Sequence, residues 1–171
     1  KMVIKIGDKI SDFELDAFHN GNIEKVKLDN FKNKWLVFVF YPADFTFICP
    51  TELADLADHY LEFKKLNAEV FGVSTDSVYV HRAWHNSSPL VNKVNYPLIA
   101  DPSGRLCRIF GTYLENEGVS LRGSFIVNPN GVVKTLEIHD NNIGRSAAEL
   151  LRKLQAAIFV SENEGMLCPA N

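Results

Sequence analysis

The chain has 171 residues, of which 46% are hydrophobic and 23% charged, and its formal net charge at pH 7 is -3. This length suits one well-buried core and is short for two domains. The charge balance argues against nucleic acid and anionic membranes as partners. No apolar run approaches the roughly 20 residues that span a bilayer. The N-terminus also lacks the layout of a signal peptide, so the cytoplasm is the expected location.

Three cysteines are present, at positions 49, 107 and 168. Their odd number and wide spacing argue against the disulfide framework of a small secreted domain. Because no Cys-x-x-Cys pair occurs, a structural zinc site is not expected either. We therefore expect a protein that works through its own side chains, without a metal or another cofactor.

The first half of the chain predicts one long helix after a buried strand. Residues 1–34 read as short extended pieces and turns, with a clear turn at "HNGN", residues 19–22. Residues 35–41 form a continuous apolar, β-rich run, which is typical of a strand buried on both faces. Residues 50–66 follow with apolar positions at helical spacing, acidic residues early and lysines late, a polarity that suits the helix dipole.

The second half of the chain predicts shorter strands and helices. Strands are predicted at residues 70–74 and 97–100, and a strand hairpin is predicted at 124–127 and 132–138 around "NPNG". Helical segments are predicted at residues 77–86, 104–110 and 145–159, with a small tail at 165–171. This order of elements predicts an α/β fold with a mixed central β-sheet flanked by helices.

The stretch "DFTFICPTE", residues 44–52, places one cysteine at the end of the apolar run, directly before the expected helix. If the helix starts near Pro50, its first-turn N–H groups point at the Cys49 sulfur, and proline there loses no hydrogen bond. A helix N-terminus stabilises an anion and so favours the thiolate, the reactive form of cysteine. A thiolate alone does not make a fast enzyme, because the transition state must also be stabilised.

Several neighbours of this cysteine could supply that stabilisation. Thr46 offers a hydroxyl that can donate and accept, and Pro42 can shield the site and fix the turn. An arginine from elsewhere could hold the thiolate and polarise a substrate oxygen, and the candidates are Arg122 and Arg145. Glu52 could hold either arginine through a bidentate pair.

The other candidate residues carry weaker signals. Cys107 lies in "GRLCRIF" without a polar helper, which favours a packing role over that of an accessory thiol. His81 and His85 are four residues apart but lack a third ligand and a neighbouring carboxylate at helical spacing. We interpret both as solvated histidines on a helix face and not as a metal site.

Residues 42–49, "PADFTFIC", match the P-x-x-x-T-x-x-C active-site signature of peroxiredoxins. The longer string "FYPADFTFICPTE" resembles the typical 2-Cys branch, which includes the alkyl hydroperoxide reductase C proteins and the thioredoxin peroxidases. Further stretches agree in order along the chain: "GVSTDS", Trp84, "DPSG", "ENEGVSLRGSFIVNPNG", "GRS" and "CPA". The resemblance therefore covers nearly the whole chain.

This resemblance implies a thioredoxin-like fold with an N-terminal extension, in which residues 1–160 form the domain and residues 161–171 form a tail. It implies that Cys49 is the peroxidatic cysteine, which reduces hydrogen peroxide or an alkyl hydroperoxide and becomes a sulfenic acid. The resolving cysteine is then Cys168, in the tail. The remaining implied site residues are Thr46 and Arg122 on the peroxide oxygens, Pro42 as a shield, and Glu52 with Arg145 as the pair that orders the arginines.

The resemblance also implies partners. In this branch the resolving cysteine attacks the sulfenic acid of a second protomer, so a homodimer is needed, and the branch often builds a decamer of five dimers. Thioredoxin or a dedicated flavoprotein reductase then reduces the disulfide. The region before the third strand lacks the Gly-Gly-Leu-Gly insertion of peroxide-sensitive members, and the chain stops at Asn171 without their Tyr-Phe helix. We therefore expect an enzyme that resists overoxidation.

Three other functions remain open from the residues. A thiol–disulfide oxidoreductase would place a second cysteine where the chain has Glu52. A cysteine hydrolase needs a histidine base, and no motif supplies one. An oligomeric chaperone-type stress protein is compatible with the sequence and need not exclude peroxidase activity.

Overall fold

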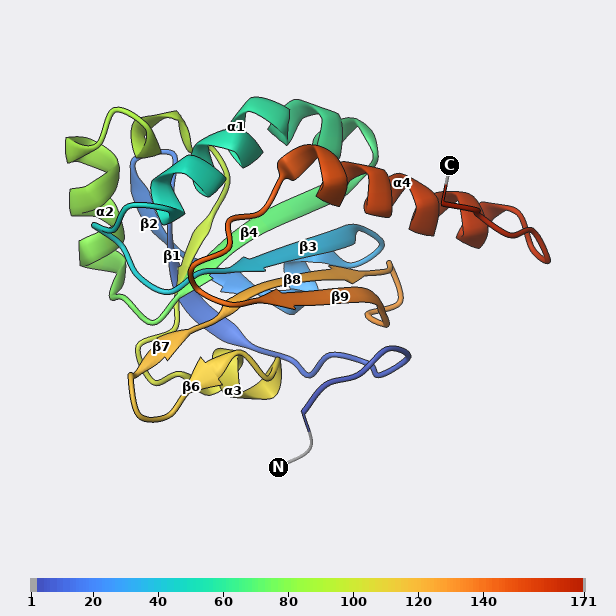
Figure 1. Ribbon diagram of the computed structural model, residues 1–171, viewed down its shortest axis with the longest axis horizontal. Helices are drawn as coiled ribbons and strands as arrows, with labels where there is room; N and C mark the ends of the chain where they lie inside the picture. The colour runs from blue at the N-terminus through green and yellow to red at the C-terminus, as the bar shows by residue number, and fades with distance from the viewer. Residues whose placement is uncertain (1–2, 171) are drawn as a thin grey trace.

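The computed structural model describes residues 3–170 and contains a seven-stranded mixed sheet (Figure 1). The strand order is β2-β1-β5-β4-β3-β8-β9. Its centre is parallel, formed by β3 (Trp35–Phe40), β4 (Ala68–Ser74) and β5 (Leu98–Ala100). The predicted α/β class with a mixed sheet is therefore confirmed.

The outer strands are antiparallel. The hairpin of β1 (Glu14–His19) and β2 (Asn22–Lys27) extends one side, and the predicted hairpin of β8 (Arg122–Val127) and β9 (Val133–His139) extends the other. The first hairpin turns through Asn20 and Gly21, both at positive φ, as its sequence predicts. The sequence did not predict a second, two-stranded sheet, β6 (Tyr113–Leu114) and β7 (Val119–Ser120).

The predicted helices all form, with ends shifted by a few residues. They are α1 (Cys49–Lys65), α2 (Val78–Ser87), α3 (Arg105–Ile109) and α4 (Ala147–Glu162), with short 3-10 turns η1 (Leu28–Phe31) and η2 (Val91–Lys93). Helices α1 and α4 lie against each other on one face of the sheet (Figure 1). Within residues 3–170, no helix combines the length and the apolar character that crossing a bilayer requires.

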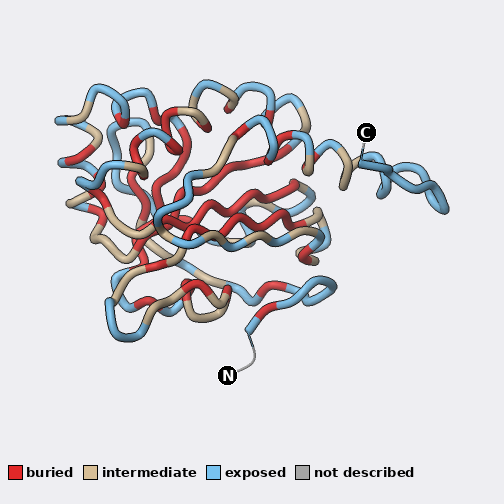
Figure 2. Tube along the Cα trace, viewed as in Figure 1, coloured by how far each residue is buried: buried red, intermediate tan, exposed pale blue. Residues whose placement is uncertain are grey.

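Strand β3 is buried on both faces, so the core has two layers (Figure 2). Trp35, Val37 and Val39 pack with α1 and α4, whereas Phe38 and its even-numbered neighbours pack with α3 and the N-terminal segment. This alternation follows from the two-residue period of a strand. Each fully buried side chain of this size contributes about 1.5–3 kcal/mol, so β3 is the strand around which both layers assemble.

The end of β3 and the starts of α1 and β8 lie at the same end of the sheet. Strand β3 ends at Phe40, and α1 begins at Cys49 after a short connection, with Pro50 in its first turn. Strand β8 runs antiparallel to β3, so its first residue, Arg122, lies at the same end. The predicted helix start and the predicted arginine are thereby brought to one place.

The tail occupies a different part of the molecule. Residues 163–170 are exposed and lack regular helix or strand. Figure 1 shows them beyond the projecting end of α4, at the opposite end of the molecule from the start of α1. Helix α4 itself extends to Glu162, slightly past the expected boundary at residue 160.

Candidate active site

The site is centred on Cys49, the first residue of α1. The residue is 0% exposed and packs at the edge of the core layer that contains α1 and α4. Arg122 donates a hydrogen bond from Nη1 to the Cys49 sulfur, with an N–S distance of 3.3 Å. Of the two candidate arginines, Arg122 is therefore the one that contacts the sulfur.

The register of the sheet aims Arg122 at this sulfur. Ser124 pairs with Val39, which faces α1, and Arg122 lies two residues earlier on the same strand. Since side chains two apart on a strand share a face, Arg122 also points toward α1. The strand register therefore places a guanidinium group directly on the sulfur of Cys49.

Glu52, one turn into α1, links the two arginines. Its Oε1 accepts from Arg122 Nη1 at 2.5 Å and from Arg145 Nη2 at 3.1 Å. Its Oε2 accepts from the Nε and the backbone N–H of Arg145, at 2.7 and 2.9 Å. The predicted bidentate pair is confirmed with Arg145, and the same carboxylate also holds Arg122.

Backbone carbonyls complete the support of both arginines. Arg122 Nε donates to the Asn141 carbonyl at 2.9 Å, and Arg145 Nη1 donates to the Gly123 carbonyl at 2.8 Å. The three charged side chains are at most 8% exposed. Two guanidinium groups and one carboxylate leave one net positive charge, which a thiolate at Cys49 would neutralise.

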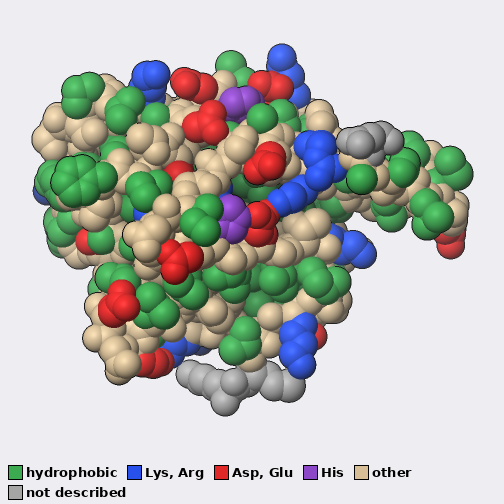
Figure 3. Space-filling view, in the orientation of Figure 1, with side chains coloured by type: hydrophobic (Ala, Val, Ile, Leu, Met, Phe, Trp, Pro, Cys, Tyr) green, Lys and Arg blue, Asp and Glu red, His purple; other side chains and the backbone are tan. Residues whose placement is uncertain are grey.

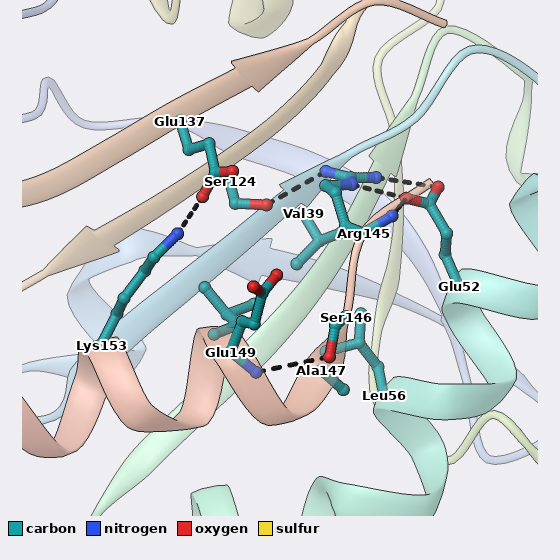
Figure 4. A pocket seen from close by; sticks show the side chains of 11 residues that line it. Val39, Glu52, Leu56, Ser124, Glu137, Arg145, Ser146, Ala147, Glu149 and Lys153 are labelled. Carbon is teal, nitrogen blue, oxygen red and sulfur yellow. Dashed lines mark hydrogen bonds and ion pairs between the residues drawn. The ribbon is translucent and has the colours of Figure 1, made fainter. Parts of the chain in front are cut away.

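A small cavity of about 20 Å³ lies beside Glu52 and Arg145, among α1, α4 and the β8–β9 hairpin. Figure 4 shows Glu52 and Arg145 pointing toward one another at one end, with Ser124 beside the guanidinium and Glu137 and Lys153 at the other end. The volume is enough for about one water molecule. The cavity therefore serves the polar network and is too small to hold an organic substrate.

The structure places Thr46 and Pro42 before the helix as expected, but it contradicts the expected direction of the first-turn amides. Thr46 is exposed, and its hydroxyl donates to the Ala43 carbonyl at 2.7 Å, while Pro42 is half-buried. The first-turn amides were expected to point at the sulfur. The N–H groups of Thr51 and Glu52 donate instead to the Ile48 carbonyl, at 3.0 and 3.3 Å, because the helix begins one residue earlier than expected.

The three cysteines have different surroundings, and all are free thiols. Cys107 is fully buried, which confirms its packing role, and burial strongly raises the pKa of its thiol. Cys168 is exposed in the tail, and its sulfur lies 3.8 Å from the Pro169 carbonyl. The fold brings Cys49, Arg122, Glu52 and Arg145 together, but it leaves the tail that carries Cys168 at the far end of α4 (Figure 1).

The interpretation of His81 as a solvated residue on a helix face is wrong. Its side chain is 0% exposed, and Nδ1 lies 2.6 Å from the carboxylate of Asp44. His85 is half-buried, with Nε2 3.1 Å from the Val94 carbonyl. The carboxylate that pairs with His81 comes from a distant part of the chain, so spacing along the helix could not reveal it.

Sequence reasoning also missed residues that act on the arginines. Asn141 contributes its backbone carbonyl, for which side-chain identity carries no signal. Ser124 accepts from Arg145 at 3.2 Å, and its place two residues after Arg122 on the predicted hairpin was the available hint. Both contacts depend on which strands pair, and pairing is a tertiary property.

A mixed seven-stranded sheet with a cysteine at a helix start and an arginine on its sulfur defines a thiol-based enzyme of thioredoxin-like fold. Residues 6–136 match the family described as AhpC/TSA. The chain is 47% identical over 165 residues to alkyl hydroperoxide reductase C of Pseudomonas aeruginosa (strain UCBPP-PA14), covering 96% of this chain and 88% of that protein. The corresponding protein of Escherichia coli (strain K12) is 46% identical over the same shares.

Solved structures agree with this assignment. The crystal structure of Enterococcus faecalis AhpC superposes with a TM-score of 0.93 and 49% identity, covering 96% of this chain and 98% of that chain. The reduced Plasmodium vivax 2-Cys peroxiredoxin superposes with a TM-score of 0.90 and 32% identity, covering 97% and 88%. The chain therefore belongs to the AhpC/TSA family, as its motifs implied, and its thioredoxin-like fold is confirmed.

Proposed function

We propose that the protein is a peroxiredoxin, a thiol-dependent peroxidase that reduces hydrogen peroxide and alkyl hydroperoxides at Cys49. The observation that carries this proposal is the guanidinium of Arg122, whose Nη1 lies 3.3 Å from the sulfur and also donates to Glu52, while its Nε donates to the Asn141 carbonyl. Membership of the AhpC/TSA family and the likeness to alkyl hydroperoxide reductase C support the substrate class.

In the first step the Cys49 thiolate attacks the terminal oxygen of the peroxide. An S–O bond forms and the O–O bond breaks, so the sulfur becomes a sulfenic acid, and the other oxygen leaves with the electron pair and takes a proton to become water or an alcohol. Arg122 stabilises charge on the sulfur before the step and on the oxygens during it. Because Glu52 fixes the guanidinium in advance, little reorganisation accompanies the reaction.

Thr46 and Pro42 act on the peroxide side of the sulfur in this proposal. Since the Thr46 hydroxyl already donates to the Ala43 carbonyl, its oxygen lone pairs are free to accept the proton of the peroxide. Pro42 is half-buried and shields the sulfur from water. The segment around them must move slightly to admit substrate, because Cys49 is 0% exposed.

The second step joins the sulfenic acid to the resolving thiol of Cys168, forming a disulfide and releasing water. We assign residues 1–160 to the catalytic domain and residues 161–171 to the tail that carries this cysteine. The tail lies at the opposite end of the molecule from the start of α1, which is Cys49 of its own chain (Figure 1). A tail that reaches the Cys49 of a second protomer therefore fits the geometry best, and the disulfide is intersubunit.

A homodimer is the minimal assembly that this step requires. Strand β9 is an edge strand of the sheet, and two of its side chains, Leu136 and Ile138, are 38% and 40% exposed. Hydrophobic side chains also cover the projecting end of α4 and the tail, where Leu167 is 86% exposed (Figure 3). Phe47, next to the site, is 96% exposed, which supports a further contact between dimers in a decamer.

The proposed cycle closes when an external dithiol reduces the disulfide. A thioredoxin or a flavoprotein reductase has the required chemistry, since thiol–disulfide exchange returns both cysteines to thiols. A site that depends on free thiols suits a reducing compartment, so we place the protein in the cytoplasm.

The alternative of a thiol–disulfide oxidoreductase is less well supported. Such an enzyme needs a second sulfur at the position of Glu52. Glu52 is committed instead to four hydrogen bonds with two arginines. An oligomeric chaperone role is compatible with the exposed apolar residues, and client protection that survives Cys49→Ser would reveal it.

Peroxide consumption with dithiothreitol tests the proposal. Cys49→Ser should abolish it, whereas Cys168→Ser should oxidise Cys49 once and then turn over only through the small thiol. Cys107→Ala is the matched control and should keep the wild-type rate, because that thiol is buried away from the site. Full activity in Cys49→Ser, or an inert wild-type protein, would contradict the proposed function.

A further inference from the structure

A buried polar network lies under the segment that joins β3 to α1. His81 of α2 places Nδ1 2.6 Å from Asp44 Oδ2 and Nε2 3.0 Å from the Ile99 carbonyl of β5. The Tyr41 hydroxyl donates to Asp44 Oδ1 at 2.7 Å. The side chains of Asp44 and His81 are both 0% exposed. The Asp44 side chain is therefore bonded to Tyr41, directly after β3, and to His81 of α2, and to none of the catalytic side chains.

Proton counting shows that this pair carries one shared proton. The Ile99 carbonyl can only accept, so His81 Nε2 must carry a hydrogen. One further proton lies between Nδ1 and Asp44 Oδ2. Burial raises the pKa of Asp44. Burial opposes charge on His81 too, but the hydrogen bond and charge of Asp44 outweigh it and raise the pKa of His81. Either placement of the proton leaves the pair neutral and the hydrogen bond intact.

A strained part of the chain follows the pair directly. Phe45 follows Asp44 directly and has a φ of +57°, a conformation that costs a non-glycine residue about 1–2 kcal/mol. It persists because both of its flanks are fixed. On one side the backbone N–H of Asp44 donates to Asp76 at 2.9 Å. On the other side Thr46 bonds back to Ala43, and α1 begins three residues later.

Two aromatic contacts place Trp84 beside this segment. Its ring centroid lies 6.1 Å from those of Phe45 and Tyr41, and Trp84 is 3% exposed, on the same helix as His81. Helix α2 therefore supports the segment at two points, through the pairing of His81 with Asp44 and through the contact of Trp84 with Phe45. Movement of Asp44 away from His81 would change the surroundings of this tryptophan.

We propose that Asp44 and His81 form a positioning clamp that holds the segment 42–48, and with it Thr46 and Cys49, in the peroxide-reactive arrangement. Because Cys49 is 0% exposed, the start of α1 must leave its place before the oxidised sulfur can meet Cys168, and the clamp opposes that movement. The clamp deepens the proposed function and rests on it. Asp44 and His81 touch neither the sulfur nor the substrate. Their effect is on the balance between two conformations, one that reacts with peroxide and one that forms the disulfide.

This role predicts opposite changes in two successive steps. Loss of the clamp should slow oxidation of Cys49, because Thr46 and the sulfur are no longer held together. It should accelerate disulfide formation, because the start of α1 leaves its place more readily. A variant that is only less stable would not shift the two steps in opposite directions.

The variants follow from the hydrogen bonds. Asp44→Ala removes the acceptor of Tyr41 and the partner of His81. Asp44→Asn keeps the network, because the amide oxygen can accept from Tyr41 while its NH₂ donates to Nδ1 of neutral His81. Glu69→Ala is the matched control, since Glu69 is a buried carboxylate that accepts from Tyr60 at 2.6 Å, on β4 and away from the segment.

Stopped-flow tryptophan fluorescence with hydrogen peroxide measures both steps in full-length protein, and Cys168→Ser isolates the first. For Asp44→Ala we expect Cys49 oxidation to slow about tenfold, as for loss of one hydrogen bond to a charged group, and disulfide formation to accelerate about threefold. Asp44→Asn should stay within about threefold of wild type in both steps, which is the rescue by the conservative variant.

The proposal is overturned if Asp44→Ala changes both steps by the same factor as Glu69→Ala, or changes neither. If Asp44→Ala does not fold, Tyr41→Phe removes a single hydrogen bond of the network and decides the question. It should lower the ratio of oxidation rate to disulfide rate, and an unchanged ratio overturns the clamp. Failure of the proposed function is distinguishable, because wild-type protein would then show no oxidation by peroxide.

Discussion

Substitution of Glu52 by glutamine tests whether one carboxylate organises the two arginines. In the wild type, each carboxylate oxygen accepts two hydrogen bonds from N–H groups of Arg122 and Arg145. Glutamine has nearly the same shape, but one oxygen becomes an NH₂ group. Whichever way the amide is turned, two of the four contacts then join a donor to a donor.

The size of the effect follows from burial. Glu52 is 3% exposed, and its partners Arg122 and Arg145 are 4% and 8% exposed. Removal of one member of a buried ion pair costs about 3–5 kcal/mol, and we expect Glu52→Gln to lie near the lower end, about 3 kcal/mol. For a chain of this length that corresponds to a fall in melting temperature of about 6–12 °C.

Calorimetry of the reduced protein measures this fall in melting temperature. Peroxide consumption measures how much activity is lost when Arg122 is no longer held in place by Glu52. The control is Glu69→Gln, a buried carboxylate whose partners are one tyrosine, one half-exposed lysine and the backbone N–H of Val70. We expect the control to lose less stability and to keep its activity. If Glu52→Gln melts within about 2 °C of wild type and keeps full activity, the carboxylate does not organise the site.

Three further predictions concern other parts of the fold. Gly104→Ala should lower the free energy of unfolding in urea by roughly 2 kcal/mol or more, because Gly104 has a φ of +67° and a Cβ there would lie 2.5 Å from the ring of Tyr113. Burial raises the pKa of Cys107, so iodoacetamide should label this thiol only after denaturation, and rapid labelling of native protein would contradict its packing role. The hydrogen bond from Lys153 lowers the pKa of Glu137, so its stabilisation is present at neutral pH and is lost as the pH falls below 4.5. The difference in melting temperature between wild type and Lys153→Met should therefore shrink in acid, and a constant difference would refute the assignment.

Local patterns in the sequence were enough to predict the buried central strand, the start of the catalytic helix and the family. The apolar run at β3 predicted a strand buried on both faces, because such a run cannot turn a polar face to water. Proline after Cys49, with an early acid and late lysines, predicted the start and direction of α1. The peroxiredoxin signature around Cys49 then indicated the family. Each of these signals lies within a few residues, where sequence and local conformation are directly coupled.

The partners of the catalytic sulfur were decided only by the tertiary structure. Arg122 is 73 residues from Cys49, and it faces the sulfur because Ser124 pairs with Val39 in the sheet. A slip of one residue in that pairing would turn Arg122 to the opposite face of the sheet. The same holds for His81, whose carboxylate partner lies 37 residues away. Strand register and helix packing depend on the whole core at once, so no short stretch of sequence encodes them.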